Sequence, residues 1–77
     1  MKLRLEGDFT KLKLNGLSLV EHLARVPGHD NIVEVDFDTN TRAISSFKVD
    51  GVEMLGEFMG GLRVTEFTEE LKVKEIE

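Results

Sequence analysis

The sequence predicts an α+β fold in which one short helix packs on a mainly antiparallel sheet of five or six strands. Three observations predict it. Segment 32–54 contains alternating apolar and polar runs separated by turn residues, which indicates a central three-stranded meander. Two further alternating runs stand near the N-terminus, and a helix-capping sequence follows them. With 77 residues, the chain is expected to form a single domain, 1–77, around one small core.

Near the N-terminus, segments 2–5 and 11–14 alternate leucine with a basic residue. A period of two is typical of strands that bury one face. We expect these strands to pair as a hairpin through Gly7-Asp8. The solvent face of this hairpin would then carry a basic stripe formed by Lys2, Arg4, Lys11 and Lys13.

The single helix is predicted after this hairpin. Ser18 and Glu21 have the three-residue spacing of a capping box, in which the glutamate side chain accepts the backbone N–H of the first residue. A helix over 19–26 follows from this start. Pro27-Gly28 should end it, because proline has no N–H and glycine adopts the left-handed turn that ends helices.

The central meander is predicted from its turns. Asp50-Gly51 is typical of a two-residue hairpin turn, and it pairs Val49 with Val52 and Lys48 with Glu53. A loop over 39–41 would place Phe37 opposite Ala43 and Val33 opposite Phe47. The predicted buried face consists of Val33, Val35, Phe37, Ala43, Phe47, Val49, Val52, Met54 and Phe58. The predicted solvent face consists of Glu34, Asp36, Asp38, Arg42, Lys48, Glu53 and Glu57.

Two interpretations fit the C-terminal segment, 65–77. The spacing of four between Phe67 and Leu71, with acidic residues before basic ones, suits a helix. The alternation at Leu71 and Val73 suits a strand. We expect a final strand, following a strand through Leu62 and Val64.

Charge and composition limit the classes of function. The net charge is −5, with +2 over the first 27 residues and −7 over the remainder. An acidic domain repels a phosphate backbone, so nucleic acid is an unfavourable partner. The chain has no cysteine, and its longest apolar runs fall far short of the roughly 20 residues that span a membrane. We therefore expect a cytoplasmic protein without a signal peptide or membrane contact.

One acidic spacing suggests a calcium site but lacks its most demanding residues. Asp36, Asp38 and Asn40 match the first ligands of an EF-hand loop. Thr41 stands where that loop needs glycine, and Phe47 stands where it needs a bidentate glutamate. Asp and Asn are also common at hairpin tips, so the sequence favours an ordinary solvated turn.

The histidines do not define a chemical site either. His22 shares a helical face with Ser18, but Ser18 is already used as a cap and no third group orients the pair. His29 lies in the following loop, seven residues away, without a carboxylate at ligand spacing on the same element. We therefore expect no metal, no cofactor and no enzymatic activity.

Two surfaces remain as candidates for binding a protein. The first is the acidic strand face formed by Glu34, Asp36, Asp38, Glu53 and Glu57, which would steer a basic partner. The second is an apolar patch formed by Ile44, Leu55 and Met59. Ordinary packing of this apolar cluster under the C-terminal segment is the alternative.

These features suggest a small, acidic, non-catalytic domain that inhibits or modulates a larger protein. A basic, nucleic-acid-handling protein is the expected partner, by analogy with the small inhibitors made by phages and mobile elements. The second hypothesis is a structural subunit that assembles through sheet edges and the apolar patch into a homo-oligomer or viral-type ring.

Overall fold

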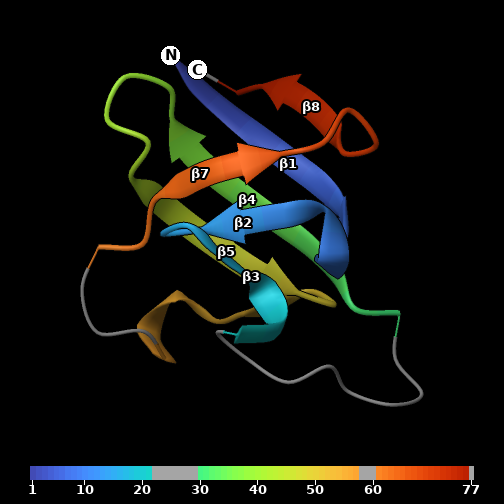
Figure 1. Ribbon diagram of the computed structural model, residues 1–77. Coiled ribbons are helices and arrows are strands. Elements are labelled where there is room, and N and C mark those ends of the chain that lie inside the picture. The colour runs from blue at the N-terminus through green and yellow to red at the C-terminus, as the bar shows by residue number, and fades with distance from the viewer. Residues whose placement is uncertain (22–29, 58–60, 77) are drawn as a thin grey trace.

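The chain forms two antiparallel sheets packed face to face (Figure 1). A computed structural model describes residues 1–21, 30–57 and 61–76. The larger sheet has five strands in the order β6-β5-β4-β1-β8, and the smaller has three in the order β3-β2-β7. The strands of the larger sheet are β1 (Lys2–Asp8), β4 (Ile32–Asp38), β5 (Ile44–Val49), β6 (Val52–Glu53) and β8 (Lys72–Glu75). The strands of the smaller sheet are β2 (Leu12–Leu14), β3 (Leu17–Ser18) and β7 (Val64–Phe67). The short 3-10 turns are η1 (Phe9–Lys11), η2 (Leu19–Glu21) and η3 (Leu55–Glu57).

The α+β prediction is wrong, because the described residues contain no α-helix and form two sheets. The predicted capping contact does exist: the backbone N–H of Ser18 donates to Oε2 of Glu21 at 3.0 Å. In the described part of the chain it caps one 3-10 turn, η2. A capping contact satisfies the first free N–H of a turn and does not specify how far a helix continues. Segment 22–26 and Pro27-Gly28 lie outside the described residues.

The predicted N-terminal hairpin is also wrong. β1 pairs with β4 on one side and β8 on the other, whereas β2 pairs with β3 and β7 in the smaller sheet. The turn η1 separates the two strands, and the Asp8 side chain caps it by accepting the Thr10 N–H at 2.8 Å. Alternation marks both segments as strands but carries no information about their neighbours.

The hairpin between β5 and β6 is confirmed. Val49 pairs with Val52 and Lys48 pairs with Glu53. The turn residues Asp50 and Gly51 have φ of +51° and +83°. Positive φ at both central positions is the requirement of a type I′ turn, which Asp-Gly satisfies with little strain.

The pairing of β4 with β5 is confirmed, but its register differs from the prediction by two residues. Val33 lies opposite Val49, and Val35 lies opposite Phe47. Ser45 is an extra residue, because the ladder shifts between the pairs of its two neighbours. A shift of two leaves the side chains of residues 46–49 on their predicted faces, so the alternating pattern could not reveal it. Beyond Ser45 the extra residue reverses the alternation: Ile44 lies opposite Phe37 and packs against the core, whereas Ala43, which was predicted to be buried, is exposed.

The predicted buried face is confirmed at its centre and fails at its rim. Val33, Val35, Phe37 and Phe47 are fully buried, whereas Ala43 is exposed and Val52 is 60% exposed. Val52 belongs to the edge strand β6, where burial by the second sheet declines. Val49 and Met54 are half-buried, and Phe58 lies outside the described residues.

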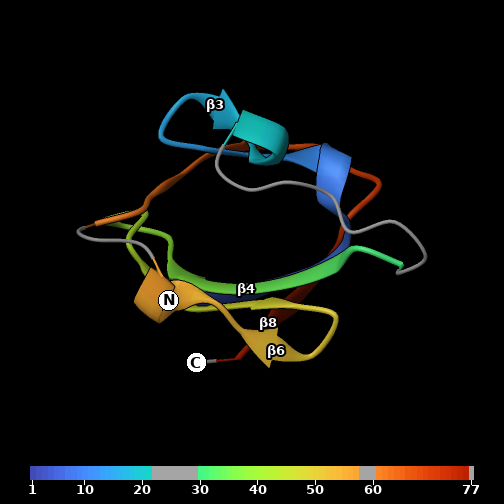
Figure 2. The same cartoon turned by 90° about the horizontal axis from the view of Figure 1, so that it is seen from below.

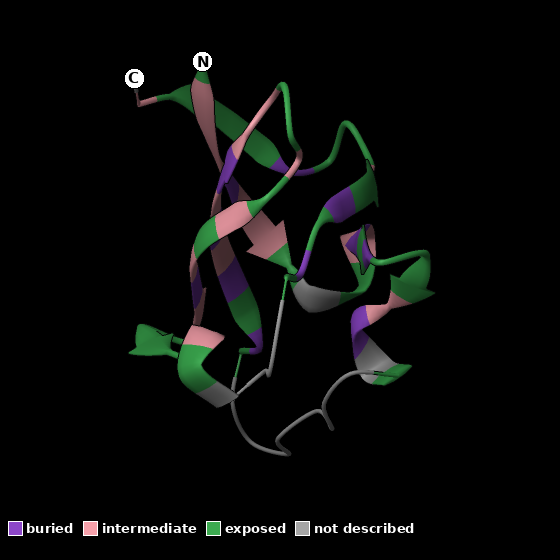
Figure 3. Cartoon of the chain, turned by 90° about the vertical axis from the view of Figure 1, so that its left-hand side faces the viewer, coloured by how far each residue is buried: buried purple, intermediate pink, exposed green. Residues whose placement is uncertain are grey.

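The core lies between the two sheets. Figure 2 shows the smaller sheet lying across the curved inner side of the larger one, and in Figure 3 the buried positions of β4 alternate with half-buried ones. The C-terminal strand β8 confirms the predicted final strand. The buried apolar residues are Leu5, Leu12, Leu14, Leu19, Val33, Val35, Phe37, Phe47, Leu62, Val64 and Leu71.

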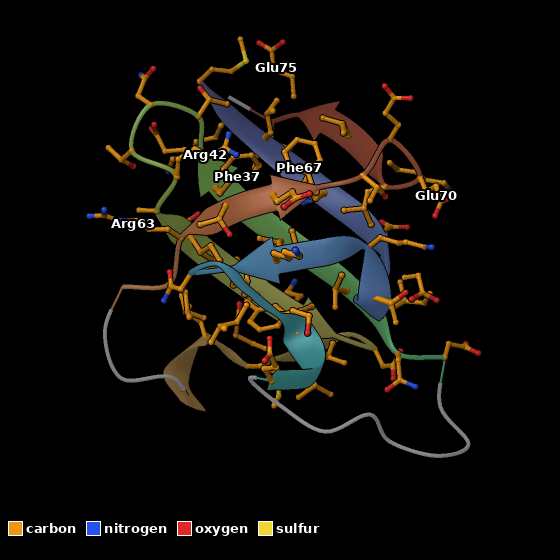
Figure 4. The ribbon with its side chains drawn as sticks, viewed as in Figure 1. Phe37, Arg42, Arg63, Phe67, Glu70 and Glu75 are labelled. Carbon is orange, nitrogen blue, oxygen red and sulfur yellow. The ribbon has the colours of Figure 1, made fainter. Side chains whose placement is uncertain are left out.

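Arg42 connects the two sheets at one side of the core. Its Nε donates to the Val64 carbonyl at 2.9 Å, and its guanidinium lies 5.3 Å from the centre of the Phe37 ring. The Phe37 ring meets Phe67 edge-on, with ring centres 6.1 Å apart (Figure 4). Arg42 was predicted on the solvent face beside Asp38, but the structure turns its side chain toward β7.

The described part of the chain has no helix that is long and apolar enough to cross a membrane.

Two apolar residues that were predicted to share the buried face should now behave differently on truncation. Phe47→Ala removes a fully buried ring and should lower the free energy of unfolding by roughly 3–5 kcal/mol. Val52→Ala should lower it by less than about 0.5 kcal/mol, because the side chain is mostly exposed. Urea denaturation of both variants measures the difference, and equal losses would contradict the observed packing.

Candidate protein-binding surface

The candidate surface is the outer face of the five-stranded sheet, which is the side turned away from the core. Directly opposite residues of paired strands share a face, so the register identifies its members. Carboxylates predominate on β4 and β6, with Lys48 of β5 between them, and we call the acidic residues of this part the acidic half: Glu34, Asp36, Asp38 and Glu53. Cations predominate on β1 and β8, where Glu6 is the acidic exception, and we call the basic residues of this part the basic half: Lys2, Arg4, Lys72 and Lys74.

The boundary between the halves is held by an ion pair between Arg4 and Asp36. Nε of Arg4 donates to Oδ1 of Asp36 at 2.7 Å, and the second contact, from Nη2 to Oδ2, is 3.0 Å. This two-point geometry is the strongest arrangement of a guanidinium with a carboxylate. The hydrogen bond and the charge of Asp36 raise the pKa of Arg4 above its ordinary value. The Asp36 side chain is only 13% exposed, so its charge is largely committed to Arg4.

The Asp38 carboxylate is fixed by the loop that follows β4. Its Oδ1 accepts the backbone N–H of Asn40 at 2.7 Å and that of Thr41 at 3.2 Å. These two hydrogen bonds stabilise the ionised form and lower the pKa of Asp38. The two aspartates of the D-x-D-x-N motif therefore have structural roles: Asp36 forms the ion pair with Arg4, and Asp38 accepts the N–H groups of the loop.

The Glu53 carboxylate is fixed in a similar way on β6. Its Oε1 accepts the Ser46 hydroxyl at 2.7 Å, and its Oε2 accepts the N–H of Phe47 at 2.9 Å and of Leu55 at 3.2 Å. These hydrogen bonds, led by the one from Ser46, lower the pKa of Glu53. The carboxylate thus holds the β5–β6 hairpin and the start of η3 together.

The outer face is therefore bipolar, which the sequence did not reveal. Pairing of β1 with β4 sets Lys2 opposite Asp38 and Arg4 opposite Asp36, so much of the predicted acidic stripe is compensated within the sheet. Glu34 is half-buried, and one of its oxygens lies 3.4 Å from Nε of Arg4. The signal that could have indicated this arrangement is the matching spacing of two in both strands, K-x-R against D-x-D.

The predicted basic stripe is divided between the two sheets. Lys11 and Lys13 accompany β2, where Nζ of Lys11 lies 2.8 Å from Glu70 and Nζ of Lys13 lies 3.7 Å from Glu66. Lys11, Lys13 and Glu66 line a hollow of about 60 Å³ between β2 and β7. These lysines are thus paired with acids of the C-terminal segment.

The remaining predicted site residues belong to β5, η3 and the segment that follows η3. Ile44 and Leu55 are half-buried and pack against the core. Glu57 ends η3, and its side chain lies outside the described residues, as does Met59. The apolar patch formed by Ile44, Leu55 and Met59 therefore stays a prediction.

The described residues include no cluster of three or more histidine, aspartate or glutamate side chains that could hold a metal ion. His22 and His29 lie outside the described residues.

Comparisons with known proteins do not identify a relative of this chain. No protein-family model, no curated protein and no solved structure matches it. Its function has to be inferred from its own residues.

The lowered pKa values of Asp38 and Glu53 predict acid sensitivity. A carboxyl group whose pKa is lower in the folded state stabilises that state above its unfolded pKa, and the stabilisation disappears as the pH falls through the folded pKa. The free energy of unfolding should therefore fall as the pH drops below the ordinary values, 3.8 for Asp and 4.5 for Glu. Glu53→Gln keeps the acceptor and removes the charge, so the fall should be less steep. Denaturation from pH 6 to about pH 2 tests this, and identical pH profiles for the two proteins would contradict the role of Glu53.

Proposed function

We propose that this chain is a small non-catalytic binding domain that inhibits or modulates a larger, basic protein, for example one that handles nucleic acid. The docking surface is the acidic half of the outer face. The proposal places the protein in the cytoplasm, where the partner acts. The observation that supports it is that Asp38 and Glu53 are held in place by backbone and hydroxyl donors.

Fixed carboxylates suit this role for an energetic reason. A flexible acidic side chain loses conformational freedom when it docks, which offsets part of the interaction with a cation. Asp38 and Glu53 are already ordered by the fold, because hydrogen bonds to their ionised carboxylates hold the side chains in place and lower both pKa values. Their charges are available to a partner at a smaller entropic cost.

The bipolar face also orients the partner. A basic segment is attracted to β4 and β6 and repelled by Lys72 and Lys74 of the basic half. Asp36 is not a docking residue in this proposal, because Arg4 already occupies its carboxylate. In this proposal the steering charges of β4 are Glu34, which lies 3.4 Å from Nε of Arg4 outside the two-point pair, and Asp38, which the loop holds in place.

A second candidate function, a subunit of a homo-oligomeric assembly, is favoured by a separate observation. The two edge strands of the larger sheet each present an exposed valine, Val52 on β6 at 60% and Val73 on β8 at 51%. Exposed edges of a sheet can pair with a strand of another molecule.

The steering mechanism predicts a defect in association rate for a charge-neutralised variant. The double variant Glu34→Gln and Asp38→Asn removes two charges, and the Asn side-chain oxygen can still accept both N–H groups of the loop. For a partner captured from the host that makes this protein, the association rate should fall several-fold at low salt and depend less on ionic strength. Surface-binding kinetics at two salt concentrations measure both effects.

A matched control separates steering from a general change of net charge. Glu66→Gln combined with Glu69→Gln also removes two charges, but from β7 and the turn that follows it. This variant should retain most of the association rate. Equal rates for wild type and the Glu34/Asp38 variant would refute docking through the acidic half.

A further inference from the structure

We propose that copies of this chain join head to tail, with the β8 edge of one copy pairing in parallel with the β6 edge of the next. The inference deepens the second candidate function and rests on it. It shares one residue, Glu53, with the acidic half, so the experiment below measures assembly and partner binding separately. The proposed pairing rests on three properties of the two edges: their free backbone groups, their direction and their side chains.

The backbone of β8 leaves two residues with outward hydrogen-bonding groups. In an antiparallel pair, successive residues turn their N–H and C=O groups alternately toward and away from the neighbouring strand. The N–H of Ile76 donates to the Lys2 carbonyl at 3.0 Å, so Lys74 and Lys72 also face β1. Val73 and Glu75 consequently direct their backbone groups away from the sheet.

At the opposite edge, β6 also has a residue whose backbone N–H and C=O point away from the sheet. The N–H of Met54 donates to the Phe47 carbonyl at 2.7 Å, and Val52 pairs with Val49, so both Met54 and Val52 face β5. Glu53 lies between them and directs its own N–H and C=O away from the sheet.

The directions of the edge strands determine how two copies can continue one sheet. Every neighbouring pair in β6-β5-β4-β1-β8 is antiparallel, so β6 and β8 run in the same direction. A second copy in the same orientation therefore offers β6 to β8 as a parallel neighbour. Glu53 of the next copy then sits between Val73 and Glu75, donates its N–H to the Val73 carbonyl and accepts the Glu75 N–H.

This register also matches the side chains. Val52 of the next copy lies opposite Val73 on the inner face, which covers the exposed valine of each edge. Glu53 of the next copy lies opposite Lys74 on the outer face. Within its own copy, the neighbour of Lys74 across the ladder is Arg4, a like charge whose guanidinium is already bound to Asp36. A carboxylate from the next copy therefore provides a counter-ion.

A symmetric dimer through two β8 edges is disfavoured by the same residues. If Val73 pairs with Val73 of the other copy, Lys72 lies opposite Lys74. If Lys74 pairs with Lys74 of the other copy, those two lysines lie opposite each other. Like charges directly opposite in a ladder are destabilising, and edge lysines are a common means of preventing such pairing. Pairing of unlike edges avoids this repulsion and leaves one free edge at each end, so it propagates into a ring or a filament.

The contact area is small, so the assembly should be weak and reversible. Two short strands bury far less than a standard interface of about 1,600 Å², and a dissociation constant on the order of 0.1–1 mM is expected. Sedimentation equilibrium from about 10 µM to about 1 mM should show a molar mass that rises continuously with concentration. A monomer throughout this range would overturn the proposal.

Two variants block one edge each. Val73→Pro removes an N–H that faces away from β1, so the β1–β8 ladder retains its hydrogen bonds; Val73→Lys is a second variant that keeps every backbone donor. Val52→Lys places a charge at the β6 edge. Leu17→Lys is the matched control, because Leu17 is 44% exposed but lies on β3 of the other sheet.

Mixing the two blocked variants is the decisive measurement. Each edge variant alone should be reduced to a monomer or nearly so, whereas a mixture of Val73→Lys and Val52→Lys retains one intact edge of each kind and should form a one-to-one dimer. The Leu17→Lys control should assemble like the wild type. Continued assembly of the single variants, or failure of the mixture to dimerise, would overturn the proposal. The Val73→Lys variant keeps the acidic half intact, so loss of assembly with normal partner binding separates this inference from the proposed docking.

Discussion

The insertion of β1 between β4 and β8 is the interaction on which the rest of the structure depends. Its inner face brings Leu5 into the core beside Val35, and its outer face brings Arg4 to Asp36. Its other edge supports β8, which would otherwise have no neighbour in the larger sheet. One strand thus determines the centre of the core, the charge pattern of the outer face and the position of an exposed edge.

The same arrangement explains why the acidic composition does not produce a uniformly acidic surface. Cations of β1 stand beside carboxylates of β4, so part of the charge is compensated inside the sheet. The carboxylates with lowered pKa values, Asp38 and Glu53, are held by hydrogen-bond donors of the loop and the hairpin. Both proposals depend on this polarity: the acidic half would bind a basic partner, and the two unlike edges would bind each other.

Local chemistry accounts for what could be predicted from the sequence. The Asp50-Gly51 turn specifies its own hairpin because both residues accept positive φ, and the pairing of Lys48 with Glu53 follows from that turn length. Alternation identified most of the strands and the buried centre of β4, but not β3, which was expected to lead into a helix. The contact of Ser18 with Glu21 spans three residues and was also predictable, although the helix expected from it is a single 3-10 turn in the described residues.

Only the tertiary structure decided which strands became neighbours. The segments that became β1 and β2 have the same alternating pattern, yet they belong to different sheets. The hydrophobic effect is not directional, so any segment that covers an apolar face stabilises it, and alternation alone does not select the neighbour. The shift of two residues between β4 and β5 preserves the faces of residues 46–49 and is therefore invisible to periodicity, whereas the bulge at Ser45 turns Ile44 toward the core and leaves Ala43 exposed. The position of Arg42 across Phe37 likewise required two sheets, since its carbonyl partner belongs to a strand that follows 22 positions later. A sequence pattern specifies the face that a side chain occupies along an unbroken strand, whereas neighbours, register and bulges are decided by the packing of segments that lie far apart in the chain.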